Sequence, residues 1–345
     1  MRILVCEFVT GGGMPPGQPI PASLAREGDL MLRALLADLA DVPGVAPVVT
    51  RDARLPPLPP GGHSTVHSIT VRDPAESCAL WGDLTRTVDA VWPIAPETDG
   101  ALERFTRMVE AAGRRLLNSR ADAVAVTASK AATAATLSAA GLPAVPAWRV
   151  ENVEVPPGDG PWIVKPDDGA GCTDTRLLRD RTEWDRWRIG ADRTGFVVQP
   201  FVSGAPASLS MLCRDGRAWL LSANRQHVGV SGSALVYRGG VVGGLTATRE
   251  LAGLAGRIAA ALPGLFGYVG VDFIAASGGP AILPAILEVN PRLTTSYAGL
   301  RRAVGMNVAA AVLGLAREPP VAPPLPDPAR PVTLNLEALE WEAAL

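Results

Sequence analysis

The sequence predicts an α/β domain over residues 1–115, followed by an α+β region that fills most of the remaining chain. In the first part, an apolar strand-like run at 3–9 precedes a helical pattern around 24–39, and a second run at 88–94 precedes a helix at 101–112. Alternation of strands and helices is typical of a sheet covered by helices. In the second part, strand-like runs follow one another across short turns, which indicates antiparallel pairing.

Composition limits the classes of protein to which the chain can belong. Its 345 residues are 48% apolar, enough for two or three domains with real cores. A net charge of −2 with 19% charged residues provides no basic face for nucleic acid. No apolar run reaches the length of a membrane span, and the four cysteines stand singly, as reduced thiols do. We therefore expect a soluble, cytoplasmic protein that binds neither nucleic acid nor membrane.

The use of basic residues is strongly uneven. Of the 32 basic residues 30 are arginine, and the two lysines are Lys130 and Lys165. A lysine ammonium is a compact charge on a flexible stem, whereas arginine ends in a bulkier planar fork, so the two differ where a phosphate must be reached through a narrow opening. Lys130 lies in a helical pattern between an expected N-cap, Ser119, and a stop at Gly141. For this lysine a structural role and a phosphate role are about equally supported.

Lys165 lies on a strand-like run, 161–166, that leads into a glycine-containing loop. The loop carries Gly169, Ala170 and Gly171. Glycine permits close approach of the backbone, so such a loop can lay amide groups over phosphates. A buried lysine at this place would need an anionic partner. The sequence therefore predicts phosphate binding by Lys165 and this loop.

Oxygen-bearing side chains come together later in the chain. Glu288 and Asn290 stand two apart in a strand-like run, so both point to the same face. Asp272 lies in an earlier run, and the residues between, 276–280, are typical of a turn, so the two runs are expected to pair antiparallel. The three side chains should then converge.

Two carboxylates and an amide oxygen, with no thiol or imidazole nearby, form a hard ligand set. Such a set suits Mg²⁺ or Mn²⁺, whose coordination shells are usually completed by water and phosphate oxygens. Arg292, on the loop just beyond, would add a fixed positive charge beside the same phosphates. The alternative interpretation of these residues is an ordinary solvated strand face.

The N-terminal part offers candidate substrate residues. The first strand carries Glu7 at its end and is followed by a glycine cluster that includes Gly11 and Gly12, but neither a dinucleotide fingerprint nor a P-loop is present. Backbone amides of such a cluster can still meet a small anion, although a plain turn explains it equally well. Glu97 lies on a strand-to-helix loop, where open α/β sheets usually bind ligands.

A strand-like run at 196–202 ends in a bend at 203–204. The backbone of such a hinge can hydrogen-bond an adenine edge, and Pro200 would offer only its carbonyl. An ordinary buried strand is the alternative. The other expected elements are a hairpin of 208–213 and 218–224, a mobile glycine-rich loop at 238–244, an amphipathic helix at 251–262, a proline-rich stretch at 319–331 and a closing segment at 332–345.

Taken in this order, the two lysines, the glycine loop, the hinge and the oxygen-bearing triplet resemble the ATP-grasp superfamily of carboxylate–amine ligases. The resemblance runs from about residue 118 to residue 302. It implies an ATP-grasp fold, in which two α+β lobes hold ATP between them behind an α/β pre-ATP-grasp domain. The expected boundaries are 1–115 for that domain, 116–204 for the small lobe, 205–320 for the large lobe and 321–345 for the closing segment.

The resemblance implies a role for each motif. Lys165 and Arg292 would be catalytic, with Arg292 steadying an acyl phosphate while the loop at 169–173 closes over the phosphates. The expected ATP contacts are Lys130, Lys165, Gly169, Ala170, Gly171, Gln199, Pro200, Phe201 and Val202, and the expected ligands of two Mg²⁺ (or Mn²⁺) ions are Asp272, Glu288 and Asn290.

Three positions depart from the family pattern. A glutamate that usually holds the ribose shortly after the hinge is missing, and Pro206 stands about there. Pro200 occupies a hinge position that often carries Glu or Lys. Lys130 follows Ser129 rather than the commoner Asp. What replaces the ribose contact is therefore open.

Two short stretches narrow the resemblance. Residues 7–13 and 290–297 are similar to the tyramine–glutamate ligases of methanofuran biosynthesis, which makes Thr294 and Tyr297 candidate substrate residues. The alanine- and arginine-rich composition suggests a member from a high-GC bacterium, and hence the related cofactor methylofuran. The expected partners are glutamate and an aromatic amine or amino acid, tyramine or tyrosine, and a homodimer is left open.

Two alternatives remain at this stage. The chain could be another ligase of the same mechanism, one that joins D-alanines or builds a different glutamyl amide. It could instead be a non-catalytic module that binds ATP as a nucleotide sensor. The full set of Asp272, Glu288, Asn290 and Arg292 argues against the sensor, since a binder has little need of a complete phosphoryl-transfer apparatus.

Overall fold

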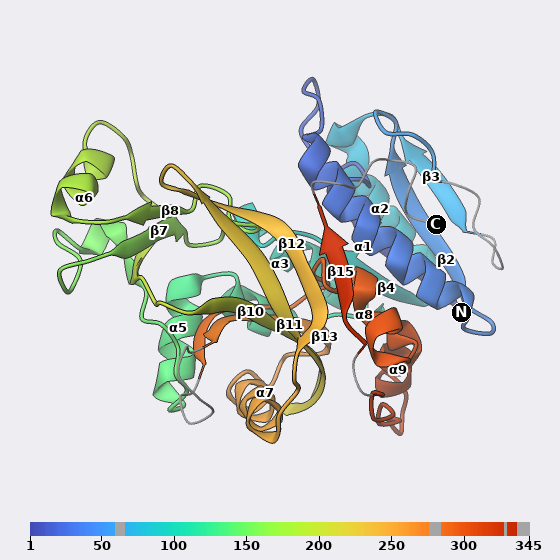
Figure 1. Ribbon diagram of the computed structural model, residues 1–345. Helices are drawn as coiled ribbons and strands as arrows, with labels where there is room; N and C mark the ends of the chain where they lie inside the picture. The colour runs from blue at the N-terminus through green and yellow to red at the C-terminus, as the bar shows by residue number, and fades with distance from the viewer. Residues whose placement is uncertain (59–65, 276–283, 328–329, 337–345) are drawn as a thin grey trace.

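The computed structural model describes residues 1–58, 66–275, 284–327 and 330–336. Two sheets organise them: one of five strands near the N-terminus and one of ten strands formed by the rest. Figure 1 shows the five-stranded sheet at one end of the molecule, the lobe with α6 (Arg181–Arg188) at the other, and the long strands of the larger sheet between them. The turn expected at 276–280 and the end of the closing segment lie outside the described residues.

The N-terminal sheet forms the predicted α/β domain, and the structure shows that it is parallel and covered by helices on both faces. Ile3 and Val5 face α1, whereas Leu4 and Cys6 face α2 and α3. Because both faces are covered, the strands at 2–7 and 90–94 are buried and largely apolar. The strand order is β3-β2-β1-β4-β5, with β1 (Arg2–Glu7), β2 (Ala46–Asp52), β3 (His67–Val71), β4 (Ala90–Ile94), β5 (Arg115–Leu116), α1 (Ala22–Ala40), α2 (Ser77–Thr87) and α3 (Ala101–Ala111).

The larger sheet pairs its strands antiparallel and forms the body of the molecule. Its order is β14-β13-β10-β11-β12-β8-β7-β9-β6, and β15 adds to β12. The strands are β6 (Trp148–Arg149), β7 (Trp162–Pro166), β8 (Arg176–Leu178), β9 (Phe196–Pro200), β10 (Ala205–Arg214), β11 (Arg217–Ser231), β12 (Ala234–Leu245), β13 (Gly267–Ala275), β14 (Ala285–Asn290) and β15 (Val332–Asn335).

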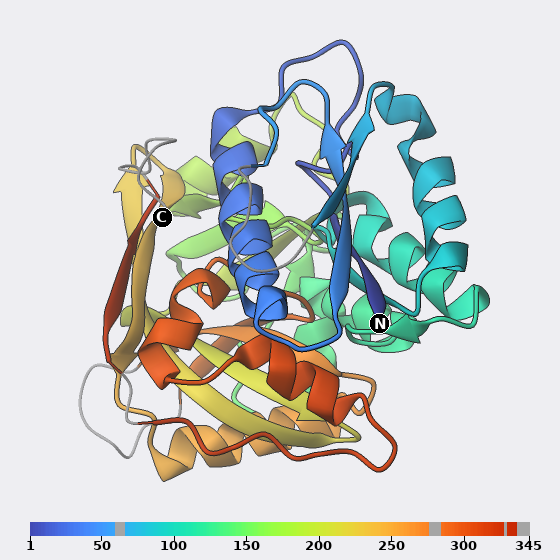
Figure 2. The ribbon, with the colours of Figure 1, turned by 90° about the vertical axis from the view of Figure 1, so that its right-hand side faces the viewer.

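Helices cover both faces of this sheet. The core on one face contains residues of α4 (Ala121–Thr127), α5 (Lys130–Ala139) and α7 (Arg249–Ala261), and the core on the other contains residues of α8 (Tyr297–Val304) and α9 (Val308–Leu315). Figure 2 shows α1 beside α8 and α9, so the two domains share one core. Short 3-10 turns join the helices and strands in the described ranges: η1 (Pro74–Glu76), η2 (Thr98–Gly100) and η3 (Val150–Asn152). No helix in the described part of the chain is long and apolar enough to cross a membrane.

The predicted hairpin is confirmed, but the glycine-rich run at 238–244 is not a mobile loop. It lies within β12, which pairs with β11 on one side and β15 on the other. A Cβ on Gly240 would lie 2.3 Å from the Arg225 carbonyl oxygen, and one on Gly239 would lie 2.1 Å from the Leu334 carbonyl oxygen. The glycines therefore serve the close approach of neighbouring strands.

The helical pattern around Lys130 is interrupted, which corrects the expected start at Ser119. Two helices, α4 and α5, replace one, and Ser129 caps the second by accepting a hydrogen bond from the Ala132 N–H at 3.1 Å. The Ser119 hydroxyl instead accepts from the Phe266 N–H at 3.2 Å. Both serines suit an N-cap, and the tertiary partner decides between them. As a result Lys130 is the first residue of a helix, which ends before Gly141 as predicted.

Candidate active site

The two lysines converge on one carboxylate. The Nζ atoms of Lys130, at the start of α5, and Lys165, on β7, lie 3.6 and 3.8 Å from Oε2 of Glu288 on β14. Both lysines are buried, at 6% and 8% exposure. Burial lowers the pKa of Lys165, and the Glu288 carboxylate opposes that shift. Two buried ammonium groups need an anion, and Glu288 supplies it from a strand far away in the sequence.

The strand pair β13–β14 assembles the predicted oxygen-bearing set. Asp272 stands opposite Glu288 in the register, and the Asn290 side-chain amide donates to Asp272 at 3.3 Å. Gln226 of β11 donates to the other Asp272 oxygen at 2.9 Å. Burial and then the Glu288 charge raise the pKa of Asp272, while the two lysine ammonium groups hold the pKa of Glu288 low against its own burial.

This donor set fits a hard divalent cation. Adjacent half-buried carboxylates repel each other, and a bound cation would offset the repulsion that, together with burial, raises the pKa of Asp272. Among the described residues, no group of three or more His, Cys, Asp or Glu side chains is placed to hold a metal ion. An ion at Asp272 and Glu288 would therefore complete its shell with the Asn290 amide oxygen and non-protein oxygens, as Mg²⁺ usually does.

Arg292 is held by a glutamate from the N-terminal domain. Its Nε and Nη2 donate to the two carboxylate oxygens of Glu97 at 2.9 and 2.8 Å, and its Nη1 donates to the Leu293 carbonyl at 3.1 Å. Burial alone would lower the pKa of Arg292, but the Glu97 carboxylate raises it, so the guanidinium stays charged. The sequence identified each residue as a candidate and gave no indication of the pair.

The start of the glycine loop is fastened to α5. Lys130 Nζ donates to the Gly169 carbonyl at 2.6 Å. Asp167 accepts from the Ser129 hydroxyl at 2.7 Å through one oxygen and from the Ala131 N–H at 2.9 Å through the other. Asp167 thus places Lys130 beside the strand that carries Lys165. We did not predict this residue, although its position directly after the Lys-Pro pair would have been a signal.

The hinge strip is partly engaged within the protein. The Gln199 side-chain amide donates to the Val145 carbonyl at 3.3 Å, and the Phe201 N–H donates to the Pro161 carbonyl at 2.9 Å. The Phe201 ring is exposed. Adenine binding by this strip stays a prediction, and it depends on groups such as the Pro200 carbonyl rather than on the Gln199 amide.

The N-terminal candidates form a tight turn. Glu7 is buried and accepts from both the N–H and the hydroxyl of Thr10, at 2.6 and 2.7 Å. Burial raises its pKa from 4.5 to about 7. Gly11 donates its N–H to the Glu7 carbonyl, where a Cβ would lie 2.4 Å from that oxygen, and Gly12 has a φ of +105°. The geometry accounts for these residues as a turn, and their substrate role stays a prediction.

The two candidates near the end of the domain differ in setting. The Thr294 hydroxyl bonds to the Tyr268 hydroxyl at 2.8 Å. Tyr297 is buried in the core between α8 and α1, and its hydroxyl donates to Asp38 at 2.7 Å. Thr294 lies on the loop that carries Arg292, close to the site. Tyr297 instead connects the two domains through Asp38.

Polar residues that the sequence did not single out surround the same site. Tyr237 bonds to Thr295 at 3.1 Å, and burial, with smaller contributions from Asp272 and Glu27, raises its pKa to about 12. Burial raises the pKa of Glu27, on α1, and the nearby Arg292 charge only partly opposes that rise. In the sequence, Tyr237 looks like a surface residue of a strand and Glu27 like a surface residue of a helix. Nothing in the neighbouring sequence therefore marks either residue as part of the site.

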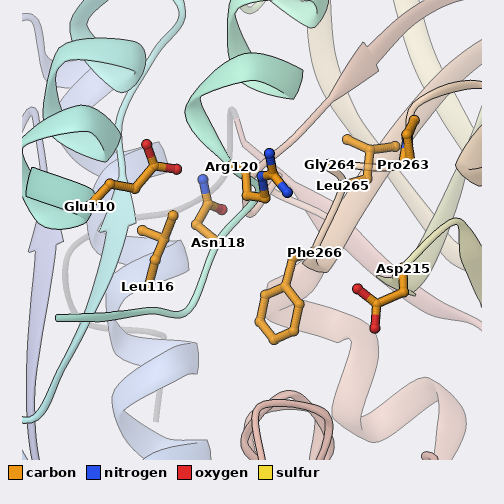
Figure 3. A pocket seen from close by; sticks show the side chains of 9 residues that line it. All are labelled: Glu110, Leu116, Asn118, Arg120, Asp215, Pro263, Gly264, Leu265 and Phe266. Carbon is orange, nitrogen blue, oxygen red and sulfur yellow. The ribbon is translucent and has the colours of Figure 1, made fainter. Parts of the chain in front are cut away.

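A separate surface cavity of about 370 Å³ lies between the domains (Figure 3). Glu110, Asn118 and Arg120 line it together with the apolar side chains of Leu116 and Phe266. Within the described residues, the buried Nδ2 of Asn118 has no hydrogen-bond partner. This cavity is not lined by the residues of the candidate active site, Lys130, Lys165, Asp272, Glu288 and Arg292. It is therefore separate from that site.

Comparison with known proteins agrees with this geometry. Residues 127–296 match the sequence profile of an ATP-grasp domain, and residues 45–124 match that of a pre-ATP-grasp domain. A tyramine–L-glutamate ligase of Methanocaldococcus fervens is 23% identical over 283 residues, which are 81% of this chain and 84% of the relative.

Solved structures share the fold. An ATP-grasp superfamily protein of Archaeoglobus fulgidus superposes with a TM-score of 0.66 at 24% identity, over 91% of this chain and 88% of that one. An L-amino acid ligase of Bacillus licheniformis superposes with a TM-score of 0.65 at 15% identity, over 91% and 73%. The predicted fold is confirmed, and the chain belongs to the ATP-grasp superfamily, with a pre-ATP-grasp domain ahead of its ATP-grasp domain.

Proposed function

We propose that the chain is an ATP-dependent ligase that joins the γ-carboxylate of L-glutamate to the amine of tyramine or tyrosine through an acyl phosphate. The observation that carries the chemistry is the convergence of Lys130 and Lys165 on Glu288, beside Asp272. The substrates are supported by the similarity to a tyramine–L-glutamate ligase over most of both chains. The role in methanofuran or methylofuran biosynthesis rests on that similarity.

In the first step, a carboxylate oxygen of glutamate attacks the γ-phosphorus of ATP. The bond from that phosphorus to the bridging oxygen breaks, and ADP leaves. The lysines, which lie 3.6 and 3.8 Å from Glu288, would contact the phosphate oxygens and neutralise the charge that develops. When bound at Asp272, Glu288 and Asn290, a divalent cation would supply further neutralisation of the phosphates.

In the second step, the amine nitrogen attacks the acyl carbon of the intermediate. The carbon–oxygen bond to phosphate breaks, phosphate leaves, and the nitrogen loses a proton as the amide forms. The Arg292 guanidinium would balance the charge on the departing phosphate. Closure of the loop at 169–173 would exclude water, which otherwise hydrolyses an acyl phosphate.

The direct test is amine-dependent ADP formation with glutamate and either tyramine or tyrosine, with the product identified by mass. The proposal expects a glutamyl amide and no ADP release above background when the amine or glutamate is omitted. Activity only with other acids and amines would assign the chain to another ligase of the same mechanism. Binding of ATP and metal without amine-dependent phosphate release would assign it to the nucleotide sensors.

A further inference from the structure

One loop of the N-terminal domain touches both lobes of the ATP-grasp domain. Glu97 accepts both hydrogen bonds from Arg292, on the loop after β14. One and two residues later, the Thr98 hydroxyl donates to the Asp168 carbonyl at 3.2 Å, and the Asp99 N–H donates to the Asp168 carboxylate at 2.8 Å. Three consecutive residues therefore contact the arginine and the start of the glycine loop.

This loop is built rigidly onto the start of α3. The Gly100 N–H donates to the Glu97 carbonyl at 2.9 Å, and the Leu102 N–H donates to the Pro96 carbonyl at 3.0 Å. Asp99 adopts a left-handed φ of +53°, which is uncommon for a residue with a side chain. That conformation accompanies the bond from its N–H to Asp168. Glu97 is thus carried on a fixed turn.

The contact with Glu97 determines how the guanidinium faces the site. Arginine has five N–H donors in a planar fork, and a two-point bond to a carboxylate fixes both its place and its plane. Among the described residues, Glu97 and the Leu293 carbonyl engage three of these donors. Two N–H groups remain for an incoming oxyanion. Without Glu97 the long side chain would regain rotamer freedom.

We propose that Glu97 is a positioning residue that presets Arg292 for the charge of the acyl phosphate. The inference rests on the proposed ligase function and replaces the expectation that Glu97 contacts substrate. Because both of its carboxylate oxygens already bind Arg292, Glu97 acts on the reaction through the arginine.

A double-mutant cycle tests this role. Glu97→Gln keeps the side-chain shape and loses the charge, and Arg292→Lys keeps the charge and loses the fork. We expect each single variant to lower kcat about tenfold, with the KM for ATP within about twofold of wild type. The double variant should be about as slow as Arg292→Lys alone, because the second change removes a contact that is already lost. Glu97→Asp should recover part of the loss.

The control and the opposing outcomes are specific. Glu103→Gln breaks an exposed ion pair with Arg107 on α3 of the same domain and should change kcat little. Independent losses that multiply to about a hundredfold in the double variant would overturn the proposal. A Glu97→Gln variant with a raised KM for glutamate or the amine and unchanged kcat would assign Glu97 to substrate binding and overturn it as well.

A measurement without substrates separates this inference from the proposed function. In the protein alone, the Arg292 Nε–H should exchange with solvent at least about tenfold faster in Glu97→Gln or Glu97→Asp than in wild type, as followed by nitrogen-15 NMR. Equal exchange rates would contradict the preset arginine, even if the ligase activity is found. Absence of ligation by the wild type would instead count against the proposed function alone.

Discussion

Glu7 and Glu97 both lie at the carboxyl ends of neighbouring strands of the N-terminal sheet but have different partners. Glu7 ends β1, Glu97 follows the neighbouring parallel strand β4, and both carboxylates are buried. The Glu7 carboxylate accepts from its own turn, with two hydrogen bonds from Thr10, three residues away. Both donors to Glu97 belong to Arg292, 195 residues away in the ATP-grasp domain. The position at the end of a strand makes each glutamate a candidate substrate residue. The hydrogen-bond partners distinguish them: Glu7 stabilises its own turn, whereas Glu97 holds an arginine of the candidate active site.

The substitutions with the largest expected effect test whether the site that Glu97 contacts through Arg292 is the active site. Glu288→Ala removes the partner of both lysines and one predicted metal ligand, and Lys165→Ala removes an ammonium group that we propose contacts the phosphates. Each should lower turnover at least about a hundredfold, which corresponds to about 3 kcal/mol of transition-state stabilisation. The measurement is amine-dependent ADP formation with Glu103→Gln as the control. Near-normal turnover in either variant would remove the reason to orient Arg292.

The next prediction concerns Glu7 and the pH dependence of stability. Because burial raises the pKa of Glu7 to about 7, folding favours its protonated form. Its contribution to stability is full below the unfolded pKa of 4.5 and is lost as the pH rises through about 7. Glu7→Gln should remove this dependence. Relative to the variant, the free energy of unfolding of wild type should fall by on the order of 3 kcal/mol between about pH 4.5 and about pH 8.

Chemical denaturation of both proteins at the two pH values measures that difference, and shared contributions from other groups cancel in the subtraction. A parallel pH dependence of wild type and Glu7→Gln would show that Glu7 is ionised in its turn. The protonation state of Glu7 would then play no part in the comparison, which would rest on the partners alone, Thr10 and Arg292.

Tyr297 shows that contact between domains does not by itself place a residue in the site. Its hydroxyl donates to Asp38 of α1 within the shared core. Tyr297→Phe should lower the free energy of unfolding by about 2 kcal/mol, since a buried carboxylate loses one of its donors. Chemical denaturation measures the loss. Unchanged stability with a raised KM for the amine would return Tyr297 to the substrate site that the sequence suggested.

The sequence predicted those features that depend on local periodicity. Asp272, Glu288 and Asn290 were expected together because alternation along a strand is strict and a turn signal lay between the two runs. The sequence also predicted that a buried Lys165 would need an anionic partner, and Glu288 is that partner, whereas phosphate binding by Lys165 and the loop after it stays a prediction. In both cases the evidence lies within about twenty residues of chain.

Features set by tertiary partners were not predictable in this way. The pairing of Glu97 with Arg292 depends on how two domains dock, and nothing in either segment encodes it. The glycines of β12 look like a loop because their composition does not reveal strands on both sides. Gln226 donates a hydrogen bond to Asp272, but in the sequence it cannot be told from the other polar residues of its long strand. In each case the deciding contact joins segments far apart in sequence.

The smallest predicted effect concerns Ser129, which combines the two behaviours in the comparison. Like Glu7 it serves its own element, because its hydroxyl oxygen accepts from the Ala132 N–H of α5. Like Glu97 it reaches another segment, because the same hydroxyl donates to Asp167 at 2.7 Å. Ser129→Ala should lower the free energy of unfolding by about 1 kcal/mol through loss of the cap.

Ser129→Asp separates the two contributions, because aspartate caps a helix as well as serine does but would set a second carboxylate against Asp167. We expect this variant to be less stable than wild type despite its intact cap, with the deficit shrinking in Ser129→Asp/Asp167→Asn, where the repulsion is removed. Thermal and chemical denaturation measure both variants. A Ser129→Asp protein as stable as wild type would mean that the cap alone accounts for Ser129. The placement of Lys130 would then rest on the bonds from the Lys130 and Ala131 backbone amides to Asp167, without help from the serine.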